Sequence, residues 1–281
     1  MSPISARKTK NAAIANGAVI QFVVKSSRFQ ITRRFAFAVL LGLTIFAIAS
    51  AQNAPIHVFA SNGVRAVLQD LIPQCERAVG RKLDVEFATS AAIKRRIEAN
   101  ESFDVAVLAS DVIDALIKSG QLTRNRVDIG SSGVGVGMRA GAARPDIRTP
   151  EAMKETLLNA KAVTYAEEGA SRPAIDKMVQ DLGIADRLKP KTKLTKATDQ
   201  SMELLFAGQS DLVITLISEI LPVKGAELAG PLPAKFQSYV TFSTAISARS
   251  KNADAAQALV KFIAGPAAAP AFKAKGIEPH K

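Results

Sequence analysis

Short apolar runs alternate with amphipathic stretches along residues 56–119. Each run is bounded by polar or small residues, as is typical of a buried strand, and is followed by apolar positions spaced as on one face of a helix. The predicted strands are residues 56–60, 83–88 and 103–108, and the predicted helices are residues 64–79, 91–99 and 112–119. Strands and helices that alternate at these lengths predict a parallel sheet covered by helices on both faces.

A second set of alternating elements runs from residue 132 to residue 275. It opens with a strand rich in glycine, and Thr149, Pro150 and Glu151 then carry the residue types that mark the start of a helix. The predicted strands are residues 132–139, 162–165, 211–217 and 239–248, and the predicted helices are residues 149–159, 172–182, 199–207, 253–263 and 267–275. A basic connector at 187–196 separates two of these helices. The whole pattern is that of an α/β protein.

The amino-terminal segment has the three-part layout of a secretory signal peptide. Residues 35–48 form an uncharged apolar run of 14 residues, which two arginines precede and the small residues 49–51 follow. A membrane-spanning helix needs about 20 apolar residues, so cleavage between Ala51 and Gln52 is favoured over a retained anchor. The general secretory route is favoured over twin-arginine export. Because residues 1–30 are longer than a signal peptide needs, we hypothesise that translation starts further downstream.

Composition and charge narrow the classes of function. The chain of 281 residues is 48% hydrophobic and 22% charged, which is ordinary for a globular protein. Its net charge of +12 comes largely from residues 1–51, which hold seven basic residues and no acidic one. The remainder is only mildly basic, and the chain has no Trp and two Tyr on which nucleic-acid bases could stack. We therefore exclude nucleic acid as the partner.

The sequence lacks the residue sets on which many hydrolases and metal enzymes depend. Its histidines are His57, inside a predicted strand, and His280, next to the carboxyl end, which argues against a histidine triad or a zinc cluster. Its single cysteine, Cys75, falls on the apolar face of a predicted helix with Val67 and Leu71, so a packed thiol is expected. No Walker or nucleophile-elbow motif occurs. We expect a binding protein rather than an enzyme, without catalytic residues, cofactor or metal.

Several predicted helices begin with a small or polar residue directly after a strand. These turns are Ser61-Asn62-Gly63, Thr89-Ser90-Ala91, Gly169-Ala170-Ser171 and, less closely, Thr198-Asp199-Gln200-Ser201. Helix starts carry unpaired N–H groups and a partial positive charge, and in open parallel sheets such turns lie at the carboxyl ends of the strands. Taken singly, each serine is more simply a helix cap. Taken together, the turns predict a cleft that binds an anion.

Three segments of the chain resemble the molybdate-type solute-binding proteins of ABC transporters. They are residues 58–64 (VFASNGV), 87–93 (FATSAAI) and 103–106 (FDVA), and the glycine-rich strand and residues 262–266 continue the likeness. The resemblance spans residues 56–279. It implies the fold of a type II periplasmic binding protein, in which two α/β lobes, each with a mainly parallel sheet, are joined by two crossover strands.

The resemblance also implies where the lobes divide and how they move. Lobe one would comprise residues 52–134 and 241–281, and lobe two residues 135–240. The crossovers would be residues 133–138 and 239–247. Lobes joined in this way close over a ligand like the two halves of a hinge.

The resemblance further implies which positions hold the ligand. In that family an oxyanion is bound by two serines, by backbone N–H groups at helix starts and by a tyrosine hydroxyl. The second serine is matched by Ser90, and the two backbone donors by Ser171 and Gln200. The first serine is replaced by Gly63 and the tyrosine by Leu216, so two hydroxyl donors are missing.

Neighbouring residues leave alternatives for the missing donors. Ser61 or Asn62 could replace the first hydroxyl, and Arg172 could add a bidentate contact or be an exposed helix-start residue. The expected ligand-binding residues are therefore Ser61, Asn62, Gly63, Ser90, Ser171, Arg172 and Gln200. Each lost hydrogen bond to an anion weakens binding roughly 10- to 100-fold.

These observations predict a periplasmic, monomeric receptor that closes on a small anion and delivers it to an ABC permease in the inner membrane. Molybdate or tungstate is the leading ligand, and another small organic anion stays open because two donors are missing. A sensor or scaffold lobe of the same fold is an alternative class. A secreted hydrolase is a third class, which the two histidines disfavour.

Overall fold

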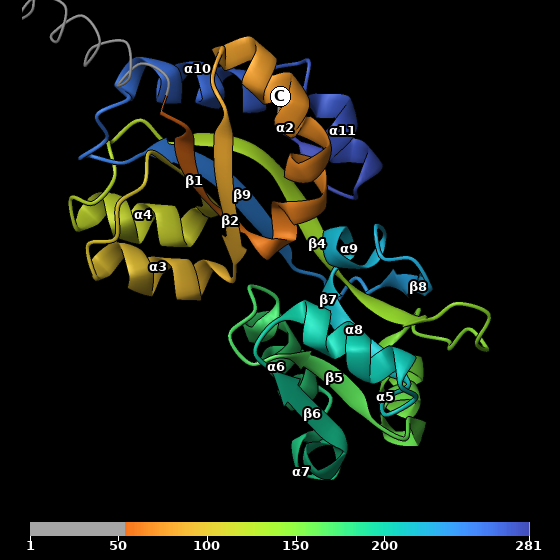
Figure 1. Cartoon of the computed structure of the whole chain (residues 1–281). Coiled ribbons are helices and arrows are strands. Elements are labelled where there is room, and N and C mark those ends of the chain that lie inside the picture. The colour runs from red at the N-terminus through yellow and green to blue at the C-terminus, as the bar shows by residue number, and fades with distance from the viewer. Residues whose placement is uncertain (1–53, 281) are drawn as a thin grey trace, which may run out of the picture. The chain divides into compact units, whose positions relative to one another are not determined.

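The computed structural model describes residues 54–280, and the region from Pro55 onward forms one compact unit (Figure 1). The predicted signal peptide and its cleavage site lie outside the described residues. Within residues 54–280, no helix has both the length and the apolar character needed to cross a membrane. The compact unit is a mixed α/β structure with two lobes, each a sheet flanked by helices.

The first lobe is built on strands β1 (Ile56–Ser61), β2 (Leu83–Ala88) and β3 (Val105–Ala109). Strand β1 lies between the other two and pairs with both in parallel. Successive side chains of a strand point to opposite faces, so Ile56 and Val58 of β1 enter one core and Phe59 enters another.

Helices cover both faces of this sheet (Figure 1). The core that contains Ile56 is closed by α2 (Arg65–Val79), α10 (Ala253–Ile263) and α11 (Ala269–Ala274). The core that contains Phe59 is closed by α3 (Ser90–Glu98) and α4 (Ser110–Lys118). Cys75 on α2 is 1% exposed, and burial raises the pKa of its thiol to about 11, which confirms the expected packed thiol.

The second lobe repeats the arrangement with strands β5 (Val163–Ala166), β6 (Thr192–Thr195) and β7 (Leu212–Leu216), all parallel, with β5 in the middle. Its longer helices are α5 (Pro150–Asn159), α6 (Arg172–Asp181) and α8 (Thr198–Phe206). Shorter elements are α7 (Ala185–Leu188), η2 (Lys189–Lys191), α9 (Ile217–Ile220) and β8 (Ala226–Pro231).

Strand β4 (Val127–Arg139) passes from the first lobe into the second. Its residues 127–133 pair with β9 (Tyr239–Ile246), and its residues 134–139 pair with β7 and β8, in every case antiparallel. The short β10 (Glu278–Pro279) also pairs with β4. The strand order is therefore β2-β1-β3-β9-β4-β7-β5-β6. The chain returns from β8 through residues 232–238, just before the segment 239–247 that was expected to cross.

The glycines of β4 are explained by close packing. A Cβ added at Gly137 would lie 2.7 Å from Val213 Cγ1, and one added at Gly135 would lie 2.9 Å from Ile217 Cγ1. Real Cβ atoms essentially never approach this closely. Glycine is required there because β7 and α9 press against the strand at the place where it passes between the lobes.

Capping residues start the helices that face the junction of the lobes. Ser61 Oγ accepts the N–H of Gly63 at 3.3 Å at the start of η1 (Asn62–Val64), and Thr89 Oγ1 accepts the N–H of Ala92 at 3.1 Å. These bonds satisfy donors that have no acceptor within their own helix. The sequence did not predict β6, α7, β8 or α9, which are short and lie in segments interpreted as connectors or as part of a strand.

Candidate functional site

A pocket of about 390 Å³ lies across the junction of the two lobes, between the starts of α3, α4 and α6. We call it the α3–α6 pocket. Its lining residues are Ser90, Ala91, Ala109, Ser110, Asp111, Val112, Glu168, Gly169, Ala170, Pro173, Ser238, Tyr239, Val240 and Thr241. The first N–H groups of each helix have no acceptor inside that helix, so they are the natural donors for an anion.

Ser90 is the predicted ligand residue that lines this pocket. It is buried, and its Oγ accepts the N–H of Ala109 at 3.1 Å, which ties the start of α3 to the start of α4. The hydroxyl still has its own proton to donate. Ser90 and the turn before Ser171 thus lie on one pocket, as the anion-cleft hypothesis requires.

Ser171 and Arg172 stand at the start of α6. Ser171 is buried and its side chain makes no capping bond. The guanidinium of Arg172 is held away from the pocket lining, because Nε donates to both carboxylate oxygens of Asp176 at 2.7 Å. It also lies 5.3 Å from the ring centroid of Tyr165. This geometry favours a helix-surface role for Arg172, and its contact with a ligand stays a prediction.

Two acidic residues, Asp111 and Glu168, line the α3–α6 pocket and oppose the binding of an anion there. Glu168 is paired with Arg95 of α3, whose Nη1 lies 2.7 Å from Glu168 Oε2. The pair therefore joins the first lobe to the turn before α6. The side chain of Arg95 is 60% exposed and that of Glu168 is 50% exposed, so the pair contributes at most about 1 kcal/mol to the free energy of unfolding.

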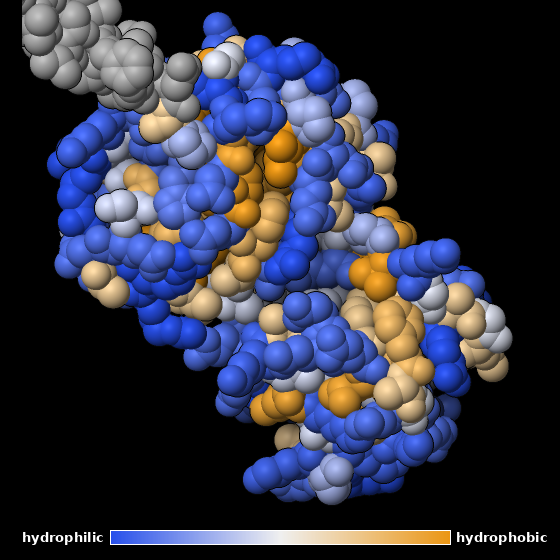
Figure 2. Space-filling model, viewed as in Figure 1, coloured by the Kyte–Doolittle hydropathy of each residue, from blue (hydrophilic) through white to orange (hydrophobic). Residues whose placement is uncertain are grey.

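A second pocket, of about 240 Å³, lies beside α9, where that helix packs against η1. We call it the α2–α9 pocket. Its lining residues are Asn62, Arg65, Ala66 and Gln69 from the first lobe and Thr198, Asp199, Met202, Ser218, Glu219, Pro222 and Val223 from the second. Figure 2 shows that the hollow between the lobes exposes mainly hydrophilic residues, with apolar residues beside it near α9 and β8.

Arg65 supplies a positive charge to the α2–α9 pocket. Its Nη2 donates to Asn62 Oδ1 at 2.6 Å, and the guanidinium lies 5.3 Å from the ring centroid of Phe87. Within the described part of the chain, Arg65 forms no ion pair. The side chain is therefore positioned by neutral partners, which leaves its charge available to an anionic ligand.

Glu219 lines the same pocket as Arg65. The hydroxyl of Thr215 donates to Glu219 Oε2 at 2.6 Å, and Thr198 Oγ1 lies 3.1 Å from Thr215 Oγ1. Burial raises the pKa of the carboxyl, and hydrogen bonds from Thr215 and Thr198 and the charge of Arg65 only partly offset that rise. Glu219 thus gains and releases a proton at a higher pH than an ordinary glutamate.

Ser218 adds a polar group without a partner. Its Oγ is buried and, in the described structure, has no hydrogen bond, although the residue lines the pocket. Its backbone N–H is used, because it donates to Ser132 Oγ at 3.1 Å. A buried hydroxyl without a partner costs free energy.

The position where the resemblance places the first serine has no room for a side chain. A Cβ added at Gly63 would lie 2.3 Å from Cζ of Phe242 and 3.0 Å from Cδ1 of Leu216. The N–H of Gly63 already donates to Ser61 Oγ. The two hydroxyls missing from the sequence are therefore replaced by packed hydrocarbon, and Ser61 and Gly63 are both buried.

Gln200 lies at the start of α8 and is exposed. Its N–H donates to Asp199 Oδ1 at 2.9 Å, and its Oε1 accepts the N–H of Lys196 at 3.0 Å. Its predicted role as a backbone donor stays a prediction. The structure does place Asn62 and the neighbouring Thr198 and Asp199 together on the α2–α9 pocket.

Sequence reasoning missed Arg65, Ser218 and Glu219. One signal was present, because Glu219 is the only charged residue between Leu212 and Val223, in a run that is otherwise almost entirely apolar. A carboxyl in such a run must be buried or must face a site, and either outcome makes it unusual. No comparable signal marked Arg65, which begins an ordinary amphipathic helix.

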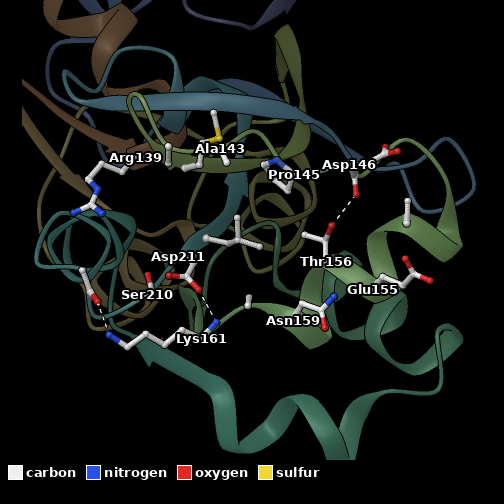
Figure 3. Close-up of a pocket in the computed structure, with 16 residues that line it drawn as sticks. Arg139, Ala143, Pro145, Asp146, Glu155, Thr156, Asn159, Lys161, Ser210 and Asp211 are labelled. Carbon is white, nitrogen blue, oxygen red and sulfur yellow. Dashed lines mark hydrogen bonds between the residues drawn. The ribbon is translucent and has the colours of Figure 1, made fainter.

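A further cavity, of about 720 Å³, lies within the second lobe between the loop after β4, α5 and the turn before β7 (Figure 3). Its polar groups bind one another: Lys161 N–H donates to Asp211 Oδ2 at 2.5 Å, and Thr156 Oγ1 donates to the carbonyl of Asp146 at 2.7 Å. Ser210 Oγ is buried there without a hydrogen-bond partner. Because residues of one lobe alone line this cavity, closure of the lobes does not complete it.

Two lobes that share a long strand and meet over helix starts define the fold class of type II periplasmic binding proteins. The family model for bacterial extracellular solute-binding proteins matches residues 56–278, and the chain belongs to that family. Aconitate isomerase of Pseudomonas sp. is 28% identical over 83% of this chain and 90% of its own length. Molybdate-binding protein ModA of Escherichia coli K12 is 25% identical over 81% of this chain and 90% of its own.

Solved structures show the same fold. The periplasmic molybdate-binding protein of Azotobacter vinelandii superimposes with a TM-score of 0.68 at 16% identity and covers 80% of this chain and 100% of its own. The sulfate-binding protein SubI of Mycobacterium tuberculosis has a TM-score of 0.67 at 16% identity and covers 81% of this chain and 87% of its own. These likenesses extend over the whole two-lobed unit.

Proposed function

We propose that this chain is an exported receptor that binds a small organic anion with two or more carboxylates between its two lobes. Membership of the solute-binding family and the signal-peptide pattern support export and binding. The name of the relative aconitate isomerase refers to an unsaturated tricarboxylate, which makes tricarboxylates the first class of ligand to test.

The observation that carries this proposal is a change in the type of donor. Hydroxyl donors are missing at Gly63 and Leu216, and a charged donor, Arg65, lines the α2–α9 pocket beside them. Where the resemblance implies two hydroxyls for an oxyanion, Gly63, Leu216 and Phe242 leave only hydrocarbon. Beside that place, Arg65 offers a guanidinium that forms no ion pair with any described residue, and guanidinium groups bind carboxylates in a bidentate manner. A ligand with several carboxylates and a hydrocarbon backbone matches this combination of charge and apolar surface.

Molybdate is the rival ligand, and the two molybdate-binding relatives favour it. Two missing hydroxyls would each weaken its binding roughly 10- to 100-fold. The proposal therefore places molybdate below organic anions in affinity.

Delivery to an ABC permease in the inner membrane, a periplasmic location and a monomeric state belong to the same proposal. The division of the chain into residues 52–134 with 241–281 and residues 135–240 stays a prediction. So do Ser61, Asn62, Gly63, Ser90, Ser171, Arg172 and Gln200 as ligand contacts. Of these, Ser90 and Asn62 are the ones that line the two pockets at the junction.

Isothermal titration calorimetry of the exported chain tests the proposal. Citrate, tricarballylate and trans-aconitate should give saturable heats, and molybdate should bind far more weakly. Arg65→Gln should lower the carboxylate affinity roughly 10- to 100-fold, whereas Arg77→Gln, an exposed arginine on the same helix, should not. Sub-micromolar molybdate binding without any heat from the carboxylates would refute the proposal.

A further inference from the structure

The α2–α9 pocket contains a group that the binding of an anion does not require. A carboxylate facing an anionic ligand repels it, so a pure receptor gains nothing from Glu219 on the pocket wall. The same group is useful when a proton has to be taken from the ligand and returned to it. The surroundings of Glu219 therefore indicate whether the group only weakens anion binding or also transfers a proton.

The carboxyl of Glu219 is held in a defined position. The hydroxyl of Thr215 donates to Glu219 Oε2 at 2.6 Å, and Thr198 Oγ1 lies 3.1 Å from Thr215 Oγ1. A short chain of hydroxyls in the second lobe thus fixes the position of the carboxyl. Arg65 of the first lobe lines the same pocket, its charge lowers the pKa of Glu219, and it has no ion-pair partner of its own among the described residues. A proton acceptor of the second lobe, Glu219, and a carboxylate-binding guanidinium of the first lobe, Arg65, thus line one pocket.

Ser218 completes the arrangement next to Glu219 in the sequence. Its Oγ is buried and has no partner in the described structure, and the residue lines the same pocket, so its hydroxyl is a donor without an acceptor. A ligand carboxylate between Arg65 and Ser218 would receive both donors. Glu219 lines the same pocket and follows Ser218 directly in the sequence.

We propose that Glu219 is a catalytic acid–base residue that moves a proton between two carbon atoms of a bound unsaturated polycarboxylate and so shifts its double bond. This inference rests on the proposed binding of an organic anion. Glu219 takes a proton from the CH2 group beside the double bond, and the electrons of that C–H bond form the new double bond. The electrons of the old double bond then take the proton back from Glu219 at the far carbon.

The step is balanced, because one proton leaves the ligand and one proton returns to it from the carboxyl of Glu219, where it can exchange with solvent, and no oxidant or second reactant takes part. Negative charge develops on the ligand while the proton is on Glu219. Arg65 and Ser218 are placed to stabilise that charge if they hold the conjugated carboxylate. The raised pKa of Glu219 makes its ionised form a stronger base than an ordinary glutamate.

Proton NMR in deuterium oxide tests this activity with trans-aconitate and cis-aconitate as the probes. The exported chain should exchange the CH2 protons for deuterium and interconvert the two isomers. Glu219→Gln should lose the exchange by roughly 100-fold or more while calorimetry still detects binding. Glu203→Gln, the same change at an exposed position of α8, should exchange like the wild type.

The outcomes separate this inference from the proposed function. Saturable binding of aconitate to the wild type with neither deuterium exchange nor interconversion of the isomers would overturn the proton transfer and leave the receptor intact. Exchange that survives in Glu219→Gln, shown to be folded by its thermal transition, would overturn the role of Glu219. An absence of heat with every tricarboxylate would overturn the inference and the proposed function together.

Discussion

Replacing Gly63 by serine restores the hydroxyl that the molybdate-type resemblance implies, and it should destabilise the protein. The new Cβ would lie 2.3 Å from Cζ of Phe242, whereas ordinary contacts begin at 3.4 Å. Phe242 is 0% exposed, so its ring has to move by roughly 1 Å within a closely packed core. Overpacking of this kind costs about 1–3 kcal/mol.

Urea denaturation and thermal unfolding measure that cost. For a unit of this size, about 1–3 kcal/mol corresponds to a fall in Tm of roughly 2–12 °C. Ala66→Ser is a matched control, because it adds the same hydroxyl at a half-buried position on the next helix. It should change the midpoint much less than Gly63→Ser.

A double-mutant cycle tests the cause. Phe242→Leu removes the ring atoms that the new side chain would meet, so Gly63→Ser should cost less in that background than in the wild type. Residues in direct contact show couplings of about 0.5–3 kcal/mol. An additive cycle, or a Gly63→Ser variant as stable as the wild type, would refute the steric reasoning.

The remaining predictions concern Glu219, Cys75 and the ion pair between the lobes. Because burial raises the pKa of Glu219 above its ordinary 4.5, wild-type stability falls as pH rises from 4.5 through the folded pKa. Glu219→Gln should therefore raise the urea midpoint at about pH 7 more than at about pH 4, and equal gains would contradict this. Since burial raises the pKa of Cys75 to about 11, a thiol reagent should label this cysteine only when the chain unfolds. Rapid labelling of the folded chain would contradict this prediction. Arg95→Ala should change the free energy of unfolding by less than about 1 kcal/mol in urea titrations, because Arg95 and Glu168 are exposed. A loss of several kcal/mol would show that the pair is more than a surface contact.

The sequence alone predicted most of the elements, because short apolar runs, helical spacing and caps are local signals. Strand β2 and helix α10 have the predicted bounds, and Thr89 and Thr149 cap their helices as the pattern indicated. The sequence did not predict the short β6 and α9, because a few residues carry too little periodicity to be distinguished from a connector. Of the helix starts that the sequence predicted, Ser90 of α3 lines the α3–α6 pocket.

What only the tertiary structure decided is which groups meet at that junction. Arg65 and Glu219 lie far apart in the sequence, and the packing of α9 against η1 places them on one pocket. The substitution at Gly63 was visible in the sequence, but only the contact with Phe242 shows that the space of the missing hydroxyl is filled. Local patterns determine elements because their causes lie within a few residues. Pockets depend on contacts between distant segments, and those contacts exist only once the chain has folded.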